Sequence, residues 1–217
     1  MNTGTRLLWT AVAGTTVALC VALTAAGTGQ DADPAPAPVQ SVPSSAPTTA
    51  APRQTTPPTP TAGQLIGTVT IPRLQALGYP YRFPLKQGVD HDTVLNSGAV
   101  GHYADTQLPG VQGNVGLAAH RNTHGEPFRH LDRLSVGDTV MLDTPSATYR
   151  YTLDRELPQT GDDDYAVLDP IPAQAGYTAP GQYLTLTTCT PEFTSLYRLI
   201  WWGHLIARTP HPSAGGH

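Results

Sequence analysis

Two residues near the end of the chain have the chemistry for nucleophilic catalysis, a cysteine and an arginine nine positions apart. Cys189 follows Tyr183–Thr188, a run whose alternation predicts a strand that carries the thiol on its more polar face. Arg198 lies at the start of a second strand-like run, Tyr197–Ile206. If these strands pair in antiparallel fashion, the thiol and the guanidinium lie side by side. A fixed cation there lowers a thiol pKa or stabilises an oxyanion, as acyl transfer requires.

A nucleophilic thiol usually needs an acid–base partner, and six histidines of the same region are candidates: His91, His102, His120, His124, His130 and His204. His120 is favoured because it directly follows the apolar run Val115–Ala119, which places it where a strand reaches the rim of the fold. His102 is the second candidate. His124 and His130 fall in a loop and a short helical segment, so they are expected to be dispensable.

The N-terminal segment predicts a location for this chemistry. Leu7–Ala26 is a run of 20 uncharged residues, which as a helix is long enough to cross a bilayer. Arg6 precedes the run and acidic residues follow it, so residues 1–28 are expected to form an uncleaved single-pass anchor in the cell membrane. Its N-terminus is then cytoplasmic and the remaining chain extracellular. A cleaved signal peptide ending at Thr24–Ala26 is the alternative, and lipidation of Cys20 is disfavoured by the large Leu19 before it.

Composition divides the rest of the chain. Residues 29–62 hold nine prolines and no aromatic residue, so they are expected to form a disordered Pro-rich linker. Residues 63–209 hold all nine tyrosines and all three phenylalanines, and are expected to form the catalytic domain. Residues 210–217 are expected to be a flexible tail. Because Cys20 belongs to the anchor, Cys189 is a lone thiol in an oxidising compartment, which favours a reactive role.

The fold class predicted for this domain is all-β. Its apolar runs are short and rich in β-branched or aromatic residues: Leu65–Ile71, Val115–Ala119, Thr139–Leu142, Thr148–Leu153, Tyr183–Thr188 and Tyr197–Ile206. Only Asp90–Asn96 and Pro127–Leu134 have helical character. About eight strands closing into a barrel are expected. The 22 prolines and 21 glycines disfavour a helical bundle, and the net charge of −4 argues against nucleic acid as a partner.

Several motifs resemble those of a known family. Thr185–Cys189 reads TLTTC, with Arg198 after it and His120 before it, and this set resembles the TLxTC signature of sortases. Further blocks resemble class E sortases of high-GC Gram-positive bacteria: GHY at Gly101–Tyr103, HRNTHGEPF at His120–Phe128, LDRL at Leu131–Leu134 and CTPEFT at Cys189–Thr194. The resemblance covers about residues 65–208. Two positions depart from it, Ala104 where proline is frequent and Ala119 where glycine is common.

The resemblance implies a sortase-type eight-stranded β-barrel and a transpeptidase that cleaves an LAxTG- or LPxTG-like C-terminal sorting signal between Thr and Gly. Cys189 is then the nucleophile, Arg198 the oxyanion-stabilising group and His120 the acid–base residue. The implied partners are surface proteins that carry the signal and an amine nucleophile, either a peptidoglycan precursor or a pilin lysine. No cofactor is implied.

Three further residues are expected to bind substrate. The resemblance assigns Tyr103 to the preference for the sorting signal, while Thr188 adjoins the thiol and His102 adjoins Tyr103. Asp162–Asp164 follows the predicted strand Thr148–Leu153, and some sortases bind calcium in this connection. A solvated acidic loop is the preferred interpretation, because adjacent carboxylates point in different directions.

Other chemistries fit the sequence less well. His120, His124 and His130 have the spacing of a HExxHxxGxxH zinc site, but Arg121 replaces the catalytic glutamate and Pro127 the turn glycine. The SxGC setting of L,D-transpeptidases and the GxSxG elbow of serine hydrolases are both absent. The remaining alternative is a wall-associated β-barrel binding module with a structural cysteine.

Overall fold

The computed structural model describes residues 59–212. The expected membrane anchor and nearly all of the expected linker lie outside these residues. Within residues 59–212, no helix has the length and apolar character needed to cross a membrane.

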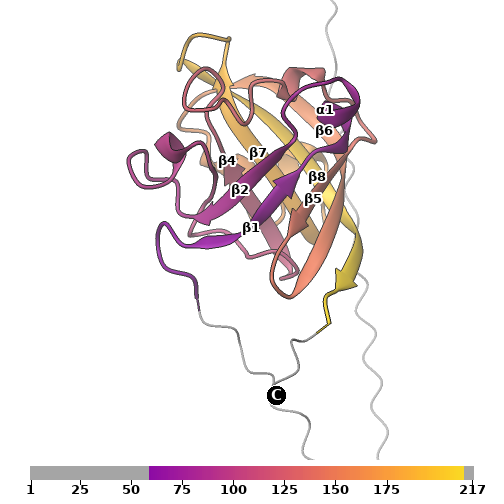
Figure 1. The fold of residues 1–217 in the computed structure, drawn as a ribbon. Coiled ribbons are helices and arrows are strands. Elements are labelled where there is room, and N and C mark those ends of the chain that lie inside the picture. Colours follow the sequence, from indigo (N-terminus) through magenta and orange to yellow (C-terminus); the bar gives the residue numbers. More distant parts are fainter. Residues whose placement is uncertain (1–58, 213–217) are drawn as a thin grey trace, which may run out of the picture. The chain divides into compact units, whose positions relative to one another are not determined.

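Eight strands close into a barrel in the order β1-β2-β3-β4-β7-β8-β6-β5, which confirms the predicted fold class (Figure 1). β2 pairs with β3 and β4 with β7 in parallel, and the other neighbours are antiparallel. The strands are β1 (Leu65–Thr70), β2 (Arg82–Gln87), β3 (Val100–His102), β4 (Gly113–Ala118), β5 (Thr139–Asp143), β6 (Ala147–Thr160), β7 (Gln182–Thr190) and β8 (Tyr197–Pro210). The helices are short: α1 (Pro72–Ala76) and the 3₁₀ turns η1 (Leu95–Ser97), η2 (Leu131–Arg133), η3 (Tyr165–Leu168) and η4 (Ala173–Ala175).

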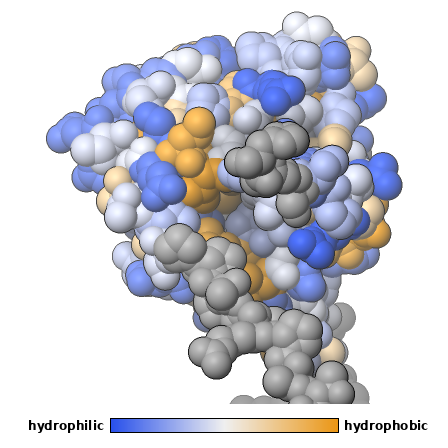
Figure 2. Space-filling view, turned by 60° about the horizontal axis from the view of Figure 1, so that its bottom comes forward, coloured by the Kyte–Doolittle hydropathy of each residue, from blue (hydrophilic) through white to orange (hydrophobic). Residues whose placement is uncertain are grey.

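The barrel interior is filled by alternate residues of the strands. On β8, Leu199 and Trp201 point inward, and on β7 Leu184 and Leu186 do the same. The view in Figure 2 shows a mostly hydrophilic face on which hydrophobic residues gather in a few patches. Because these residues point into the core, their neighbours along β7 and β8 must point out of the barrel.

A second apolar cluster lies against the outside of β8. Ile200 and Trp202 point outward and pack against Val167 of η3, in the long connection between β6 and β7. The carbonyl oxygen of Val167 accepts hydrogen bonds from Trp202 Nε1 at 2.9 Å and Thr185 Oγ1 at 3.1 Å. This connection thus covers the face of β7 that the sequence marked as the more polar one, and Thr185 and Thr187 are buried beneath it.

Six predicted strands are present, and β2 and β3 were missed. β2 alternates Phe83 and Leu85 with exposed residues, but Pro84 at its centre argues against a strand, and β3 has only three residues, too few to show a period. Helical segments were expected at Asp90–Asn96 and Pro127–Leu134. The structure has only the three-residue turns η1 and η2 there, and turns of this length are too short to show a helical period in the sequence. β8 continues through Pro210, one residue into the expected tail.

Candidate active site

Cys189 and Arg198 are directly opposite each other on β7 and β8. Opposite residues of an antiparallel pair share a face of the sheet, so both side chains leave the barrel outward. Leu186 and Trp201, which are also opposite each other on these strands, face the interior. Cys189 is unpaired and partly exposed, which leaves the thiol accessible.

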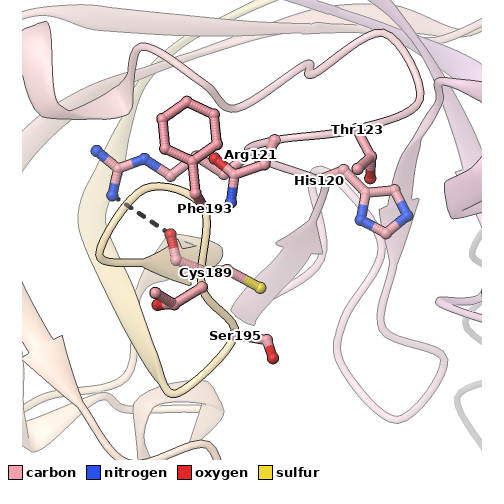
Figure 3. Close-up of a pocket in the computed structure, with 8 residues that line it drawn as sticks. His120, Arg121, Thr123, Cys189, Phe193 and Ser195 are labelled. Atoms are coloured by element: carbon pink, nitrogen blue, oxygen red, sulfur yellow. Dashed lines mark hydrogen bonds between the residues drawn. The ribbon is translucent and has the colours of Figure 1, made fainter.

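His120 reaches the same end of the barrel from β4. The parallel pairing of β4 and β7 places Ala118 opposite Thr187, so the chain after β4 emerges beside Cys189. His120 and Cys189 line one cleft of about 420 Å³, together with Arg121, Asn122, Thr123, Phe193, Thr194 and Ser195. Figure 3 shows the sulfur of Cys189 turned toward the side of the cleft where His120 lies.

The surroundings of His120 disfavour its charged form. Burial lowers the pKa of His120 most, and the charges of His124 and His91 lower it further. The His120 ring centroid lies 5.0 Å from that of His124 and 5.5 Å from that of His91. His124 is thus a close neighbour of the catalytic candidate, whereas the sequence indicated a loop residue without a role. His130 lies elsewhere, stacked on the ring of Tyr79 at 3.8 Å.

The Arg198 guanidinium is held by the β7–β8 loop. Its Nη1 donates to the carbonyl oxygens of Ser195 at 2.9 Å and Tyr197 at 3.0 Å. Nε and Nη2 donate to no residue within 59–212, so they keep donors for an oxyanion or a substrate carbonyl. Arg198 also lines a smaller hollow beside the cleft, with Tyr103, Thr187 and residues of the β6–β7 connection.

Arg121 is a buried cation that the sequence analysis did not assign to the site. Its side chain is 7% exposed and donates from Nη1 to the carbonyl oxygen of Cys189 at 3.3 Å and to Thr190 Oγ1 at 3.0 Å (Figure 3). Its Nη2 lies 3.6 Å from a carboxylate oxygen of Asp132. The residue after His120 therefore binds the backbone of the nucleophile, which ties the two chemical groups together. Its adjacency to His120 was the only sequence signal.

A second arginine links the loops on the two sides of the cleft. Arg129, in the β4–β5 loop, contacts Glu126 at 2.6 Å and Glu192 of the β7–β8 loop at 2.7 Å. Its guanidinium also lies 5.7 Å from the ring centroid of Phe193, an exposed residue of the cleft wall. These contacts hold the β7–β8 loop against the loop that carries His120.

Tyr103 lies in the hollow next to Arg198. Its hydroxyl is 3.1 Å from Thr187 Oγ1, and both residues line the hollow. Thr187 is two positions before Cys189 on the same outward face of β7. Tyr103 therefore packs against the outward face of β7 where the β6–β7 connection covers it.

The other two residues expected to bind substrate point elsewhere. Thr188 is opposite Leu199 on the inward face, is 3% exposed, and donates to the carbonyl oxygen of Ala119 at 2.9 Å. The threonine of the outward face is Thr187. The strand alternation already placed Thr188 and Cys189 on opposite faces. The prediction that Thr188 binds substrate relied instead on its position next to Cys189 in the sequence.

His102 is buried at 1% exposure, and both ring nitrogens have protein partners. Nδ1 lies 2.9 Å from Gln87 Oε1, and Nε2 lies 2.9 Å from the carbonyl oxygen of Gln107. Thr106 Oγ1, 3.2 Å from the same Nε2, also donates to the carbonyl oxygen of Tyr103 at 2.7 Å. His102 thus supports the turn that carries Tyr103 and has no free ring nitrogen to offer a peptide.

No group of three His, Cys, Asp or Glu side chains within residues 59–212 is arranged to hold a metal ion. In the acidic segment Asp162–Asp164, the Asp164 carboxylate accepts hydrogen bonds from Thr160 Oγ1 at 2.6 Å and Gln174 Nε2 at 3.0 Å. These bonds close the end of β6 onto the connection that follows it.

The chain is thus a closed β-barrel that presents a cysteine, a histidine and an arginine together at one end of β7, β4 and β8. The Sortase domain family model matches residues 69–206, and the chain belongs to the sortase family. It is 44% identical to Sortase SrtE1 of Streptomyces coelicolor over 153 residues, which are 68% of this chain and 42% of that protein. Sortase SrtE2 of the same organism is 41% identical over 118 residues, 52% of this chain and 47% of that protein.

Solved structures agree with this assignment. Sortase E1 of Streptomyces coelicolor, with a tripeptide in its active site, is 43% identical with a TM-score of 0.65, covering 70% of this chain and 96% of that one. Sortase E of Streptomyces avermitilis is 38% identical with a TM-score of 0.61, covering 71% of this chain and 98% of that one. The chain spans less than half the length of the two Streptomyces relatives SrtE1 and SrtE2.

Proposed function

We propose that this protein is a cysteine transpeptidase that cleaves a C-terminal sorting signal and joins the released protein to an amine. The observation that carries the proposal is the convergence of Cys189, His120 and Arg198 at one end of the barrel, from three strands of fixed register. The alternative, a binding module with a structural cysteine, predicts a buried thiol. Cys189 is instead partly exposed and lines a cleft with His120.

In the first half-reaction, the Cys189 thiolate attacks the Thr–Gly carbonyl carbon and forms a tetrahedral oxyanion. The Nε and Nη2 donors of Arg198 are the groups available to stabilise that charge. His120, as the imidazolium, gives its proton to the glycine nitrogen as the C–N bond breaks. The products are a thioester on Cys189 and a free amine.

In the second half-reaction, neutral His120 takes a proton from an incoming amine, which attacks the thioester carbonyl. The C–S bond then breaks and the Cys189 thiolate is restored, so the cycle is balanced without a cofactor. The reacting form needs a thiolate and an imidazolium together. A free cysteine and a free histidine, with side-chain pKa values near 8.5 and 6.5, would be in these two forms together in about 1% of molecules at neutral pH. Because the pKa of His120 is lowered by burial, this population is smaller still, and we expect turnover to be slow.

We further propose an LAxTG- or LPxTG-like signal, carried by surface proteins, as the donor. Arg198, which is opposite Cys189 on the paired strands, also lines the hollow with Tyr103 and Thr187, and its free guanidinium donors are available to an extended peptide. The proposed acceptor is a peptidoglycan precursor or a pilin lysine. The proposed location of the catalytic domain is the outer side of the cell membrane, with the uncharged segment Leu7–Ala26 as the membrane anchor.

The test is mass spectrometry of the protein incubated with sorting peptides that end in LAxTG- or LPxTG-type signals. An acyl adduct on Cys189, cleavage after threonine and transfer to an added amine are expected. A peptide with the threonine and glycine exchanged is the matched control. Cys189→Ala should form no adduct and cleave nothing, while its far-ultraviolet circular dichroism stays that of the parent. Turnover by Cys189→Ala within tenfold of the parent would exclude the thioester mechanism.

A further inference from the structure

The imidazole ring of His120 has one hydrogen-bond partner within residues 59–212, and it comes from a separate segment of the chain. Asn96 Oδ1 lies 2.9 Å from His120 Nε2, on the opposite side of the ring from its Nδ1. An amide oxygen only accepts hydrogen bonds, so Nε2 must carry the hydrogen in both the neutral and the charged ring. His120 Nδ1 has no partner within residues 59–212.

The orientation of the Asn96 amide is set by a second contact. Its Nδ2 group is 3.5 Å from Asp92 Oδ1, so a flipped amide would turn its oxygen toward a carboxylate. The backbone is held as well, because Asn96 N donates to the His91 carbonyl oxygen at 2.7 Å. Asp90 Oδ1 accepts hydrogen bonds from both the backbone N and Oγ1 of Thr93 and so closes this turn. The acceptor therefore has a defined position relative to the imidazole.

We propose that Asn96 is a positioning residue that holds His120 in the Nε2–H tautomer, so that Nδ1 is the atom that gives and takes protons in the cleft. This inference rests on the proposed transpeptidase function. If the ring were free to change tautomer, a fraction of the neutral molecules would present an N–H to the incoming amine and could not accept its proton. An amide partner removes that fraction without placing a charge beside the ring.

The groups that surround the His120 ring explain why an uncharged hydrogen-bond partner matters for its protonation. His91 and His124 lie on two sides of the ring, Asn96 on a third, and Cys189 shares the cleft. Asp92 is the nearest carboxylate in this chain of contacts, and it reaches His120 only through Asn96. Two histidines thus disfavour the imidazolium, and among residues 59–212 the amide oxygen is the one group bonded to the ring that supports it.

The direct test is ¹⁵N NMR of the full-length protein labelled at histidine, because protonated and unprotonated ring nitrogens have distinct chemical shifts. The His120 signals are assigned by their loss in His120→Gln. We expect neutral His120 to have the hydrogen on Nε2 in the parent, and a mixture of tautomers in Asn96→Ala. A parent spectrum with the hydrogen on Nδ1, or an unchanged tautomer in Asn96→Ala, would overturn the proposal.

Peptide-cleavage kinetics provide the second readout. Asn96→Ala should lower kcat by about 10-fold with little change in KM, because the ring loses both its fixed tautomer and its fixed position for proton transfer. Asn96→Asp keeps an acceptor, so it should recover most of kcat and move the acidic limb of the kcat/KM profile to higher pH, since a carboxylate raises the pKa of the imidazole. Ser97→Ala, in the same 3₁₀ turn, should match the parent in both readouts.

The two proposals fail separately. If the parent protein cleaves no sorting peptide, the transpeptidase function is wrong, and the NMR experiment still decides whether Asn96 sets the tautomer. If the parent is active and Asn96→Ala keeps the parental kcat and pH profile, the function stands and the role of Asn96 is wrong. Equal losses in Asn96→Asp and Asn96→Ala, with no shift in the pH profile, would also reject it, because they indicate a structural role alone.

Discussion

Replacing Arg121 with methionine tests whether the active site is held together by a buried cation. Methionine keeps an unbranched side chain in the space below the cleft and removes the guanidinium. The parent side chain is 7% exposed and bonds the Cys189 carbonyl oxygen, Thr190 Oγ1 and Asp132. Because Arg121 follows His120 directly, the substitution removes the hydrogen bonds that connect the segment of His120 to the backbone of Cys189.

The expected loss of stability follows from these contacts. Two buried hydrogen bonds from a charged donor are worth about 1.5–3 kcal/mol each, and breaking them leaves the acceptors unpaired. Part of this is offset, because the desolvation cost of burying the cation and its unpaired Nε disappears. A net loss of about 2–4 kcal/mol remains, which in a domain of this size lowers Tm by on the order of 10 °C. Displacing catalytic groups by about 1 Å costs roughly 10²-fold in rate, so kcat/KM should fall by that factor.

The assay combines calorimetry with peptide-cleavage kinetics at a temperature well below the lower Tm, so that unfolding does not mimic inactivation. Arg133→Met is the matched control, since Arg133 is in the same loop but its side chain is 60% exposed. Its loss should be at most about 1 kcal/mol, with unchanged kinetics. If Arg121→Met melts with the control and keeps kcat/KM within threefold of the parent, Arg121 does not hold His120 and Cys189 together.

Three further predictions concern the chemical groups themselves, each measured by steady-state cleavage of a sorting peptide. Arg198→Lys should be nearly as inactive as Arg198→Ala, because an ammonium loses the planar fork that bonds the loop carbonyls and the oxyanion together; near-parental activity would mean that only charge matters. His124→Gln removes a charge that lowers the pKa of His120, so the acidic limb of the kcat/KM profile, where His120 gains its proton, should move to higher pH; an unmoved limb contradicts that coupling. Tyr103→Phe loses the hydroxyl bonded to Thr187 and should raise KM severalfold with kcat retained, whereas a fall in kcat alone would place Tyr103 in the chemistry.

Local sequence patterns predicted the all-β fold class, six of the eight strands, and the residue types that could react. The alternation in β7 and β8 predicted strands, and their pairing as antiparallel neighbours places Cys189 opposite Arg198 as expected. Such patterns are readable because a strand that packs one face on a core must repeat every two residues. β2 was missed because Pro84 argues against a strand although the period is present, and β3 because three residues are too few to show a period.

The supporting residues were determined by tertiary structure alone. Arg121 bonds a residue 68 positions away and Asn96 one 24 positions away, and no spacing rule connects such pairs. Thr188 and His102 were chosen for their adjacency to Cys189 and Tyr103, yet alternation turns Thr188 into the barrel, and His102 is enclosed by its own hydrogen bonds. Sequence by itself thus determined which groups could react, since residue type and strand period are local properties. Which side chains orient those groups was decided only when the closed barrel brought distant loops to one end of the sheet.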